Sequence, residues 1–547
     1  MKKYYLLFTL SLLSYISFPQ ITHETAERLA DVCKYYGIGK YFSPSINIDN
    51  KNIDSIFISK FSYSEDKQSI ISLPGLYDLI PVDSIPKRNT IERKEYADSL
   101  YNALCFTTNH SENDILHIKR TLQQKHNKLK YITYNFPQGN SLPQNEVIEN
   151  ESLYPPIEER LLSVFKFWNW THYFYPYKNL IDESWTHLLS DVILSVGNAK
   201  DSLEYQLAIR EFVNRIDDAH SYTSTDLFFS HYSKKQVPLL IQIISDSIVI
   251  RAKLNPVILT TDHEISRGDC ILELDHMNYT DYKRKYFKYC AASNIEGKNK
   301  QLGGIIKWTQ KDTVHIKYLH GNDTIETKIV SIENIELYNR YQRHNKYDSL
   351  FFFNDELAYV DLSKWPIKSI PKLIRQIYNT KGIILDLRKY PEWTMFTILN
   401  YLPHDTLTPT FALWEPTKNK PGHFTRVSLD NMPYHSDSLY QGYIFTLVNS
   451  FTQSRSEFYA MAMQICDNNL TIGTKTAGAD GDVSCIDLPG KIEACFSGIA
   501  IEYHDGRQTQ QNGIYIDKQL KITQKDWKQE TDPYLAKTLK FAKDVIK

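Results

Sequence analysis

The sequence has no excess of charge of either sign and no long hydrophobic run beyond its first residues. Among 547 residues, 63 lysines and arginines balance 64 aspartates and glutamates, so the formal net charge is −1. Without a basic field, the chain is not expected to bind nucleic acid. With 42% hydrophobic residues it is neither a disordered chain nor a polytopic membrane protein. The length corresponds to roughly three or four domains.

Cysteine is scarce and does not follow a metal-binding or disulfide-rich pattern. An odd count leaves at least one thiol unpaired in a monomer. There is no C-x-x-C pair and no HExxH motif, so the sequence predicts no metal site and no cofactor. We expect buried thiols that pack as small hydrophobic side chains, with no more than one disulfide among them. The seven cysteines are Cys33, Cys105, Cys270, Cys290, Cys466, Cys485 and Cys495.

The first residues have the outline of a signal peptide. Lys2 and Lys3 precede an apolar run from Tyr4 to Phe18, which is shorter than the roughly 20 residues that span a bilayer. No positive cluster follows it, and no cysteine stands there to carry a lipid. We therefore predict a signal peptide over 1–20 and export to the periplasm, the cell surface or the medium, without stable membrane insertion after cleavage. An uncleaved anchor is the alternative.

One internal repeat is visible. Residues 27–44 and 159–176 share eight identities in 18 positions. In the second copy Leu161, Val164 and Trp168 belong to one apolar helical face, and Pro176 ends the helix. The repeat predicts two equivalent helices with aromatic cores. An alternative is that these helices form an assembly or docking region.

Composition and pattern divide the chain into segments. Pro155 and Pro156 mark a boundary after an N-terminal extension, 21–155, whose part from 45 to 150 has no predicted role. A helical subdomain, 156–230, follows, with helices at 182–196 and 201–216, the second opened by a capping box. Short alternating strands at 231–333 predict a β-rich insert. Alternating strands and helices at 334–547 predict an α/β core with a parallel-rich sheet covered by helices.

A candidate nucleophile lies in the core. Residues 443–473 read as a strand, a tight turn, a helix and a strand, with Ser454 at the helix N-terminus. This places the hydroxyl at the C-terminal edge of a parallel sheet, where α/β folds bind ligands. A structural alternative exists, because Ser454 with Glu457 three residues later also matches a capping box.

Six short segments, in order and at plausible spacing, resemble the tail-specific (C-terminal-processing) serine proteases, and in particular the branch with the tricorn core and the retinoid-binding repeats. The resemblance covers about 158–540. The segments are DDAHS at 217–221, GDCILELDHMNYTDY at 268–282, GIILDLR at 382–388, LVNSFTQSRSE at 447–457, GTKTAGA at 473–479 and NGIYID at 512–517. The resemblance implies a protease core and a PDZ-like character for the β-rich insert.

The resemblance also implies site residues. Ser454 is the nucleophile. The lysine base of one branch would follow Gly478, where this chain has Ala479, so the histidine base of the tricorn-like branch, His220, is implied instead. The acid of that branch corresponds to Gln510, whose amide oxygen can still orient the histidine.

Two further roles follow from the resemblance. The backbone N–H of Arg455 is expected to hold the oxyanion. A second donor should come from the loop after GIILDLR, where Pro391 has no N–H and Tyr390 is chosen. Four acidic residues are candidate helpers of the pair: Glu457, Asp218, Asp480 and Glu502.

The sequence thus predicts an exported serine endopeptidase that cleaves unfolded or C-terminal peptide segments through an acyl-enzyme. Its expected partner is a polypeptide substrate. A second hypothesis is a weakened or inactive peptide-binding protein on the same fold. It follows from Pro391, which has no N–H to offer in the oxyanion loop, and from Gln510, which stands where the branch has an acid. The oligomeric state is not fixed by the sequence.

Overall fold

The computed structural model describes residues 20–42, 52–60, 129–136, 139–148, 150–181, 185–224, 226–254, 256–344, 349–406, 411–429 and 438–547. The predicted signal peptide, apart from Gln20, and Cys105 lie outside these residues. None of the described helices combines the length and the apolar character that a membrane span needs.

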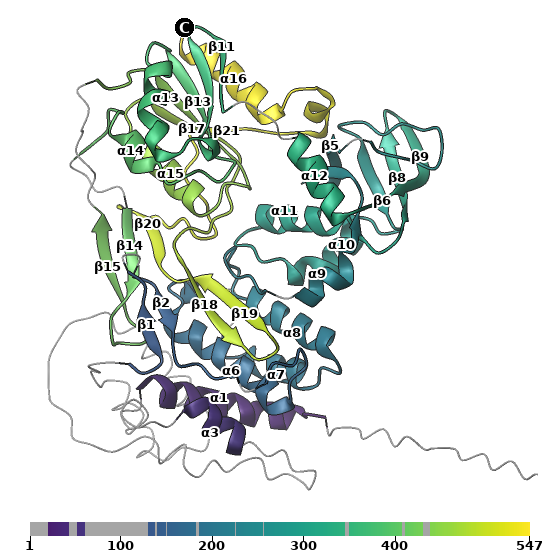
Figure 1. Ribbon diagram of the computed structural model, residues 1–547, viewed down its shortest axis with the longest axis vertical. Coiled ribbons are helices and arrows are strands. Elements are labelled where there is room, and N and C mark those ends of the chain that lie inside the picture. Colours follow the sequence, from purple (N-terminus) through teal and green to yellow (C-terminus); the bar gives the residue numbers. More distant parts are fainter. Residues whose placement is uncertain are drawn as a thin grey trace, which may run out of the picture.

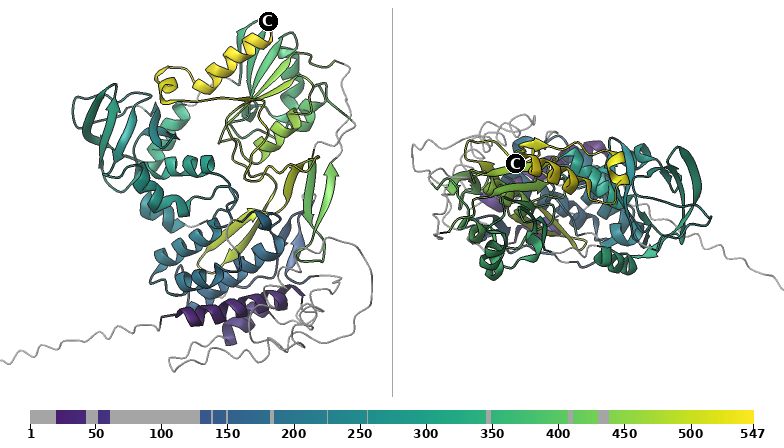
Figure 2. Two further views of the ribbon diagram at one scale, coloured as in Figure 1. Left: turned by 180° about the vertical axis from the view of Figure 1, so that it is seen from behind. Right: turned by 90° about the horizontal axis from the view of Figure 1, so that it is seen from above.

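The described elements form three regions, which Figure 1 and Figure 2 show from different sides. A helical layer that includes α1 and α6 lies at one end of the long axis. A parallel sheet with its helices and the C-terminus lies at the other end. A second, smaller sheet projects to the side between them.

The helical layer is built around α6 (Ile157–Phe174), which begins after Pro156 and ends before Pro176. The predicted helix is therefore confirmed. The prediction of a single apolar face was too narrow, because 16 of its 18 residues are buried. Its neighbours on several sides are α1 (His23–Phe42), α3 (Ile53–Lys60), α7 (Leu189–Gly197), α8 (Ser202–Asn214) and strand β18 (Val483–Leu488).

The two repeat copies pack against each other as α1 and α6, joined by buried ion pairs. Lys40 Nζ lies 3.0 Å from Asp54 Oδ1 and 2.8 Å from Glu146 Oε2. Lys166 Nζ lies 3.0 Å from Glu146 Oε2 and 3.6 Å from Asp54 Oδ2. Tyr36 donates its hydroxyl to Asp54 Oδ1 over 2.5 Å. The N-terminal helices are thus tied to α6 by charges whose loss would leave partners buried and unpaired.

Replacing Asp54 by asparagine is expected to lower the free energy of unfolding by about 3 kcal/mol, because Lys40 and Lys166 lose a buried counter-charge. Burial alone would raise the pKa of the Asp54 carboxyl, but the two lysines outweigh it and lower that pKa to about 2. This stabilisation is present above the ordinary pKa and is lost as the pH falls from about 4 towards 2. Urea unfolding at pH 7 and pH 3 measures both effects.

The control for this experiment is Asp31→Asn, which removes a partly exposed ion pair with Lys34 and should change stability by less than about 1 kcal/mol. Equal stability of Asp54→Asn and the parent protein would contradict the importance of the buried ion pairs.

The smaller sheet has the strand order β4-β5-β6-β8-β9, and all neighbouring pairs are antiparallel. All five strands were predicted. Helices α10 (Tyr279–Tyr286) and α11 (Ile295–Ile305) connect β6 to β8. The strands are β4 (Leu239–Ile244), β5 (Ser247–Lys253), β6 (Cys270–Leu274), β8 (Thr313–His320) and β9 (Asp323–Val330).

The larger sheet has the order β11-β12-β13-β16-β17-β21, and every pair after the first is parallel. The predicted α/β fold class with a parallel-rich sheet is confirmed. Strands β12 and β13 are buried along their whole length, as expected for strands covered on both faces. The elements are β11 (Leu350–Asn354), β12 (Leu357–Asp361), β13 (Gly382–Asp386), β16 (Tyr443–Val448), β17 (Asn469–Gly473) and β21 (Lys518–Gln519), with helices α13 (Ile370–Ile377), α14 (Met395–Leu399), α15 (Arg455–Met463) and α16 (Pro533–Val545).

One hairpin leaves the core region of the sequence to join the helical layer. Strand β18 pairs antiparallel with β19 (Ile492–Ser497), and Ile486, Ala494 and Phe496 belong to the same hydrophobic cluster as the helices. In Figure 1 the hairpin lies across α6 and α8, away from the parallel sheet. It therefore links the two ends of the molecule through the chain segment that follows Ala479.

Candidate active site

Ser454 stands where the chain turns from β16 into α15. Its backbone has φ 56° and ψ −126°, a conformation that non-glycine residues rarely adopt and that persists only where surrounding contacts enforce it. One such contact is the hydrogen bond from Ser454 N to Ala479 O, 2.8 Å long. The Ser454 side chain makes no capping hydrogen bond. The capping-box alternative is therefore not formed, and Oγ is not used by the helix.

Glu457 does not form a capping box with the Ser454 side chain, and its carboxylate binds the loop 476–479. Its carboxylate is buried and accepts hydrogen bonds from Thr476 Oγ1 (2.5 Å), Gly478 N (2.8 Å) and Ala479 N (3.0 Å). Burial raises the pKa of this carboxyl, against the effect of the donors. Glu457 thus fixes the loop that carries Ala479 O, and so it helps to hold the backbone of Ser454.

The loop after β13 lies against the start of α15 through the side chain of Arg455. The guanidinium donates to Pro391 O over 3.1 Å and lies 3.6 Å from the ring centre of Trp393 and 4.8 Å from that of Tyr390. The Tyr459 hydroxyl also donates to Glu392 O, 2.6 Å away. Aromatic and cationic contacts therefore hold this loop against the N-terminal end of α15. Because Arg455 is the first residue of α15, its N–H has no acceptor within the helix.

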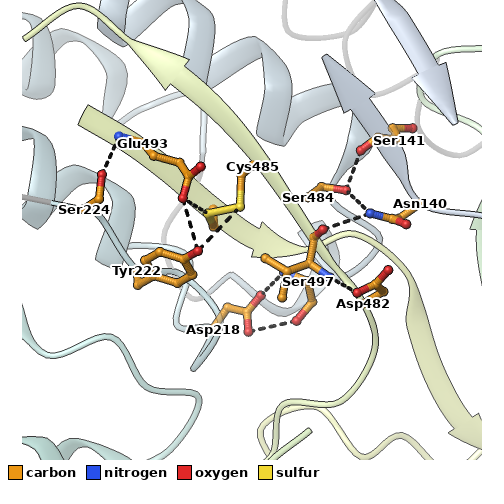
Figure 3. The surroundings of a disulfide bond; sticks show 12 residues. Asn140, Ser141, Asp218, Tyr222, Ser224, Asp482, Ser484, Cys485, Glu493 and Ser497 are labelled. Carbon is orange, nitrogen blue, oxygen red and sulfur yellow. Dashed lines mark hydrogen bonds between the residues drawn. A yellow bond between two sulfur atoms is a disulfide. The ribbon is translucent and has the colours of Figure 1, made fainter. Parts of the chain in front are cut away.

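His220 is buried and belongs to a chain of three polar side chains (Figure 3 shows two of them, Asp218 and Ser497). Its Nδ1 lies 2.9 Å from Ser497 Oγ. Ser497 in turn donates its hydroxyl to Asp218 Oδ1 (3.0 Å) and its backbone N–H to Asp218 Oδ2 (2.7 Å). Since a hydroxyl has one proton and Asp218 receives it, Ser497 Oγ must accept from Nδ1–H. The neutral ring then has an unprotonated Nε2.

The segments of Ser454 and His220 are in contact. Gln453, the residue before Ser454, donates from Nε2 to the carbonyl of Ala219, the residue before His220, over 3.1 Å. Burial lowers the pKa of the His220 imidazole; Asp218 opposes this and Lys300 adds to it. The imidazole is therefore neutral at neutral pH and able to accept a proton.

Gln510 is buried and reaches the histidine segment through Ser293. Its Nε2 lies 3.4 Å from Ser293 Oγ, and the same hydroxyl accepts from Ala219 N over 2.8 Å. Within the described ranges, the hydrogen-bond partner of His220 Nδ1 is Ser497. Ser497 and Asp218 thus occupy the position that the sequence interpretation assigned to Gln510.

Two of the candidate helpers do not reach the histidine through the hydrogen bonds described. Glu502 is paired with Arg426, whose Nε lies 2.7 Å from Oε1. Asp480 accepts from Gly481 N over 2.8 Å, and burial raises the pKa of its carboxyl well above the ordinary value.

Ser497 was missed because it lies 277 residues from His220 in the sequence and follows no motif. The one local signal is Asp218, which stands two residues before His220 and is one of the four acidic candidates. The structure brings Ser497 to it because residues 222–224 extend the hairpin: Cys495 N donates to Tyr222 O over 3.1 Å, and Ser224 N donates to Glu493 O over 3.0 Å.

A disulfide joins the two strands of this hairpin. Cys485 and Cys495 are directly opposite partners in β18 and β19, and their Cα atoms are 4.1 Å apart. Ser497 follows two residues after Cys495, and Figure 3 shows Tyr222 next to Cys485 and Asp218 next to Ser497. The expectation of one disulfide and buried thiols is confirmed for the described cysteines, since Cys33, Cys270, Cys290 and Cys466 are free and buried.

Replacing Cys485 and Cys495 together by serine is expected to lower the free energy of unfolding by about 2–3 kcal/mol, because a short loop of the unfolded chain is no longer closed. Thermal unfolding with and without reductant measures this. The control is Cys466→Ser, a buried free thiol whose replacement leaves the disulfide intact. Reductant should therefore lower its melting temperature as it lowers that of the parent protein, whereas the double variant should not respond to reductant. A parent protein that is equally insensitive would contradict the disulfide.

Among the described residues, two groups of His, Cys, Asp or Glu side chains are close enough together to hold a metal ion, and neither includes His220. The set Cys485, Glu493 and Cys495 has its two sulfur atoms joined in the disulfide. The set Glu273, His276 and His315 lies in the smaller sheet, outside the site described above.

A family model matches the region of the larger sheet, and solved structures match most of the chain. The model of peptidase family S41 matches residues 356–520, a range that includes Ser454 and Gln510 but not His220. The chain is similar to mature CPAF complexed with lactacystin at 13% identity and a TM-score of 0.53, over 71% of this chain and 98% of that one. A CPAF point mutant gives 12% identity and a TM-score of 0.56 over the same shares. At these identities the structures establish the fold alone. No curated protein sequence matches the chain.

Proposed function

Residues 356–520 match peptidase family S41, which confirms the predicted family of tail-specific, serine-type peptidases. From this premise we propose that the chain is an exported endopeptidase with Ser454 and His220 as its catalytic pair. The observation that carries the proposal is the hydrogen-bonded chain from Asp218 through Ser497 to His220 Nδ1. It leaves Nε2 as the proton acceptor in a segment that contacts the residue before Ser454.

The reaction then begins with Ser454 Oγ attacking the carbonyl carbon of a peptide bond, while His220 Nε2 accepts the hydroxyl proton. Nδ1–H keeps its hydrogen bond to Ser497, and the Asp218 carboxylate stabilises the imidazolium through that hydroxyl. The imidazolium next protonates the leaving amine, and the acyl-enzyme on Ser454 remains. Water, deprotonated by the same Nε2, hydrolyses the ester and regenerates the serine.

The developing oxyanion needs donors that are already oriented. We assign one to the backbone N–H of Arg455, which has no acceptor within α15 and lies at the positive end of the helix dipole. Tyr390 N–H is assigned as the second. The contacts of the Arg455 guanidinium with Tyr390 and Trp393 support this pairing, since one side chain connects both donor segments.

Exposed aromatic side chains around the catalytic segment favour an unfolded polypeptide as the substrate. Tyr390 is 55% exposed, Trp393 64% and Phe451 46%. Phe451 stands three residues before Ser454, and the other two contact the side chain of Arg455. Large apolar side chains that stay exposed beside a site are typical of a binding surface, and in an unfolded chain hydrophobic residues are accessible to them.

A preference for C-terminal segments is supported by two cations near the same surface. Arg251 lies 5.5 Å and Lys300 5.6 Å from the ring centre of Phe451. Lys300 Nζ also donates to Gln453 Oε1 over 3.3 Å. A terminal carboxylate bound between these cations would set the cleavage position at a short distance from the end of the substrate chain.

Export is a separate part of the proposal, and it rests on the signal-peptide pattern of the N-terminal sequence.

The pH dependence of hydrolysis should identify the base. Only neutral His220 accepts a proton, so kcat/KM is expected to fall as the pH drops through its pKa. Because burial lowers that pKa below the ordinary value of 6.5, the acid limb should have its midpoint below pH 6.5. A profile measured from pH 4 to 9 on a peptide substrate tests this. A midpoint clearly above pH 6.5 would contradict the role of a buried neutral histidine.

Cleavage of a panel of unfolded proteins tests the proposed function as a whole. The purified chain, without residues 1–20, is incubated with each protein, and the product masses are determined. Products near the C-termini would support the substrate class. Intact substrates, together with unchanged binding of unfolded peptides by Ser454→Ala, would favour the alternative of a peptide-binding protein.

A further inference from the structure

A second group of chemically reactive side chains lies on the outer face of the smaller sheet. Glu273 is in β6, His315 is in β8, and His276 is in the turn that follows β6. One potential ligand atom from each residue lies within 4.8 Å of the others. This group is separate in sequence and in element from the residues assigned to hydrolysis.

His315 has one ring nitrogen in use and one without a partner. Nε2 lies 2.7 Å from Glu326 Oε1 on the neighbouring strand β9. Nδ1 is buried from solvent and has no hydrogen-bond partner. A buried nitrogen that lacks a partner costs free energy. A carboxylate on one imidazole nitrogen with the other free is also the arrangement that orients histidine ligands of metal ions.

The turn between Leu274 and Met277 brings a second imidazole to this nitrogen. Asp275 and His276 have φ values of 52° and 63°, so both have a left-handed backbone conformation that residues other than glycine rarely adopt. As a result the His276 ring stacks on the His315 ring, with centres 4.0 Å apart and planes at 16°. Asp275 N donates to His315 O over 2.8 Å, which fixes the turn against β8.

We propose that Glu273, His276 and His315 bind a divalent transition-metal ion, with Zn²⁺ as the preferred ion. Two imidazoles and one carboxylate are a ligand set that suits zinc and leaves a fourth position for water. Tetrahedral zinc, with bonds of about 2.0–2.1 Å, needs its ligand atoms somewhat closer than they lie here. Because an imidazole nitrogen binds a metal ion in the plane of its ring, the stack must open, and the proposal requires the exposed His276 ring and the Glu273 carboxylate to turn towards His315 Nδ1.

The competing contacts of the site are weak. Lys317 Nζ lies 3.6 Å from Glu273 Oε1, and both side chains are 34% exposed. Such an ion pair contributes little in water, so a dication can replace the lysine. Glu326 keeps its hydrogen bond to Nε2 and holds the His315 ring in place. A bound metal ion would connect the turn at His276 to His315 on strand β8.

Isothermal titration calorimetry of the purified chain with ZnCl₂ tests the proposal. We expect one zinc ion per chain. Binding should weaken at least about tenfold in His276→Ala and in His315→Ala, and about tenfold in Glu326→Gln, which changes only the orienting carboxylate. Mg²⁺ and Ca²⁺ should not compete, because they prefer oxygen ligands. The control is His263→Ala, an exposed histidine before β6, which should bind like the parent chain.

Absorption of Co²⁺ in place of zinc gives a second, independent readout. Visible bands typical of four-coordinate cobalt should appear with the parent chain and be lost in His276→Ala, whose exposed turn position makes a folded variant accessible. No zinc binding by the parent chain would overturn the proposal. Equal zinc affinity in the parent chain, His276→Ala and Glu326→Gln would overturn it as well, because the ion would then be bound elsewhere.

Discussion

Replacing Ser454 by alanine is expected to lower kcat for peptide hydrolysis by about 10⁴-fold or more, because no other group in the mechanism forms the acyl-enzyme. The fold should be preserved, since the Ser454 side chain does not cap α15 and its backbone is held by Ala479 O and by the segment that Glu457 fixes. Rates are measured with a peptide substrate, and far-ultraviolet circular dichroism confirms folding.

The matched control is Ser450→Ala, four residues earlier in the same turn. It should retain activity within about twofold, because Ser450 has no part in the proposed reaction. If Ser454→Ala keeps the activity of the parent chain, the proposed serine mechanism is wrong, whatever the family.

The second large effect is expected for Asp218→Asn. Asparagine offers one acceptor where Asp218 receives hydrogen bonds from Ser497 Oγ, Ser497 N and His220 N. The Ser497 hydroxyl would then turn its proton towards His220 Nδ1 and favour the wrong tautomer. We expect kcat to fall about 10³-fold with KM changed much less, in line with the loss of the orienting acid in other serine proteases.

Ser497→Ala and Gln510→Met separate the two candidates for orienting the histidine. Removing the Ser497 hydroxyl should lower kcat about 10²-fold and move the acid limb of the pH profile, because Nδ1–H loses its acceptor. Gln510 donates to Ser293 instead, so Gln510→Met should lower kcat less than tenfold and leave the pH profile in place. The reverse order of effects would restore Gln510 to the role predicted from the sequence.

Much of the fold could be predicted from local pattern. Runs of alternating or apolar residues predicted every strand of the smaller sheet, strands β12, β13, β16 and β17 of the larger sheet, and α6, but not β11 or β21. The alternation of strands and helices after residue 356 implies parallel pairing. The packing of α6 could not be predicted, because its burial on all sides depends on α1 and on β18, which lie more than 100 and 300 residues away in the sequence.

The part of the site that lies in local sequence motifs could also be predicted. Ser454 and His220 stand in short local motifs, whereas the acceptor of Nδ1 comes from the end of a hairpin that sequence division assigned to the protease core. The hairpin contributes Ser497 only because its strands pack on the helical layer and the segment 222–224 pairs with them. A long-range pairing of this kind has no local signal.

The most direct test of the central claim is covalent labelling of the active serine. A fluorophosphonate probe is added to the chain, and the modified peptide is identified by mass spectrometry, for the parent chain and for His220→Ala. The mechanism predicts a single adduct on Ser454 that forms at least about 10²-fold more slowly in His220→Ala, because the base no longer activates the hydroxyl. No adduct on Ser454, or an adduct that forms equally fast without His220, would contradict it.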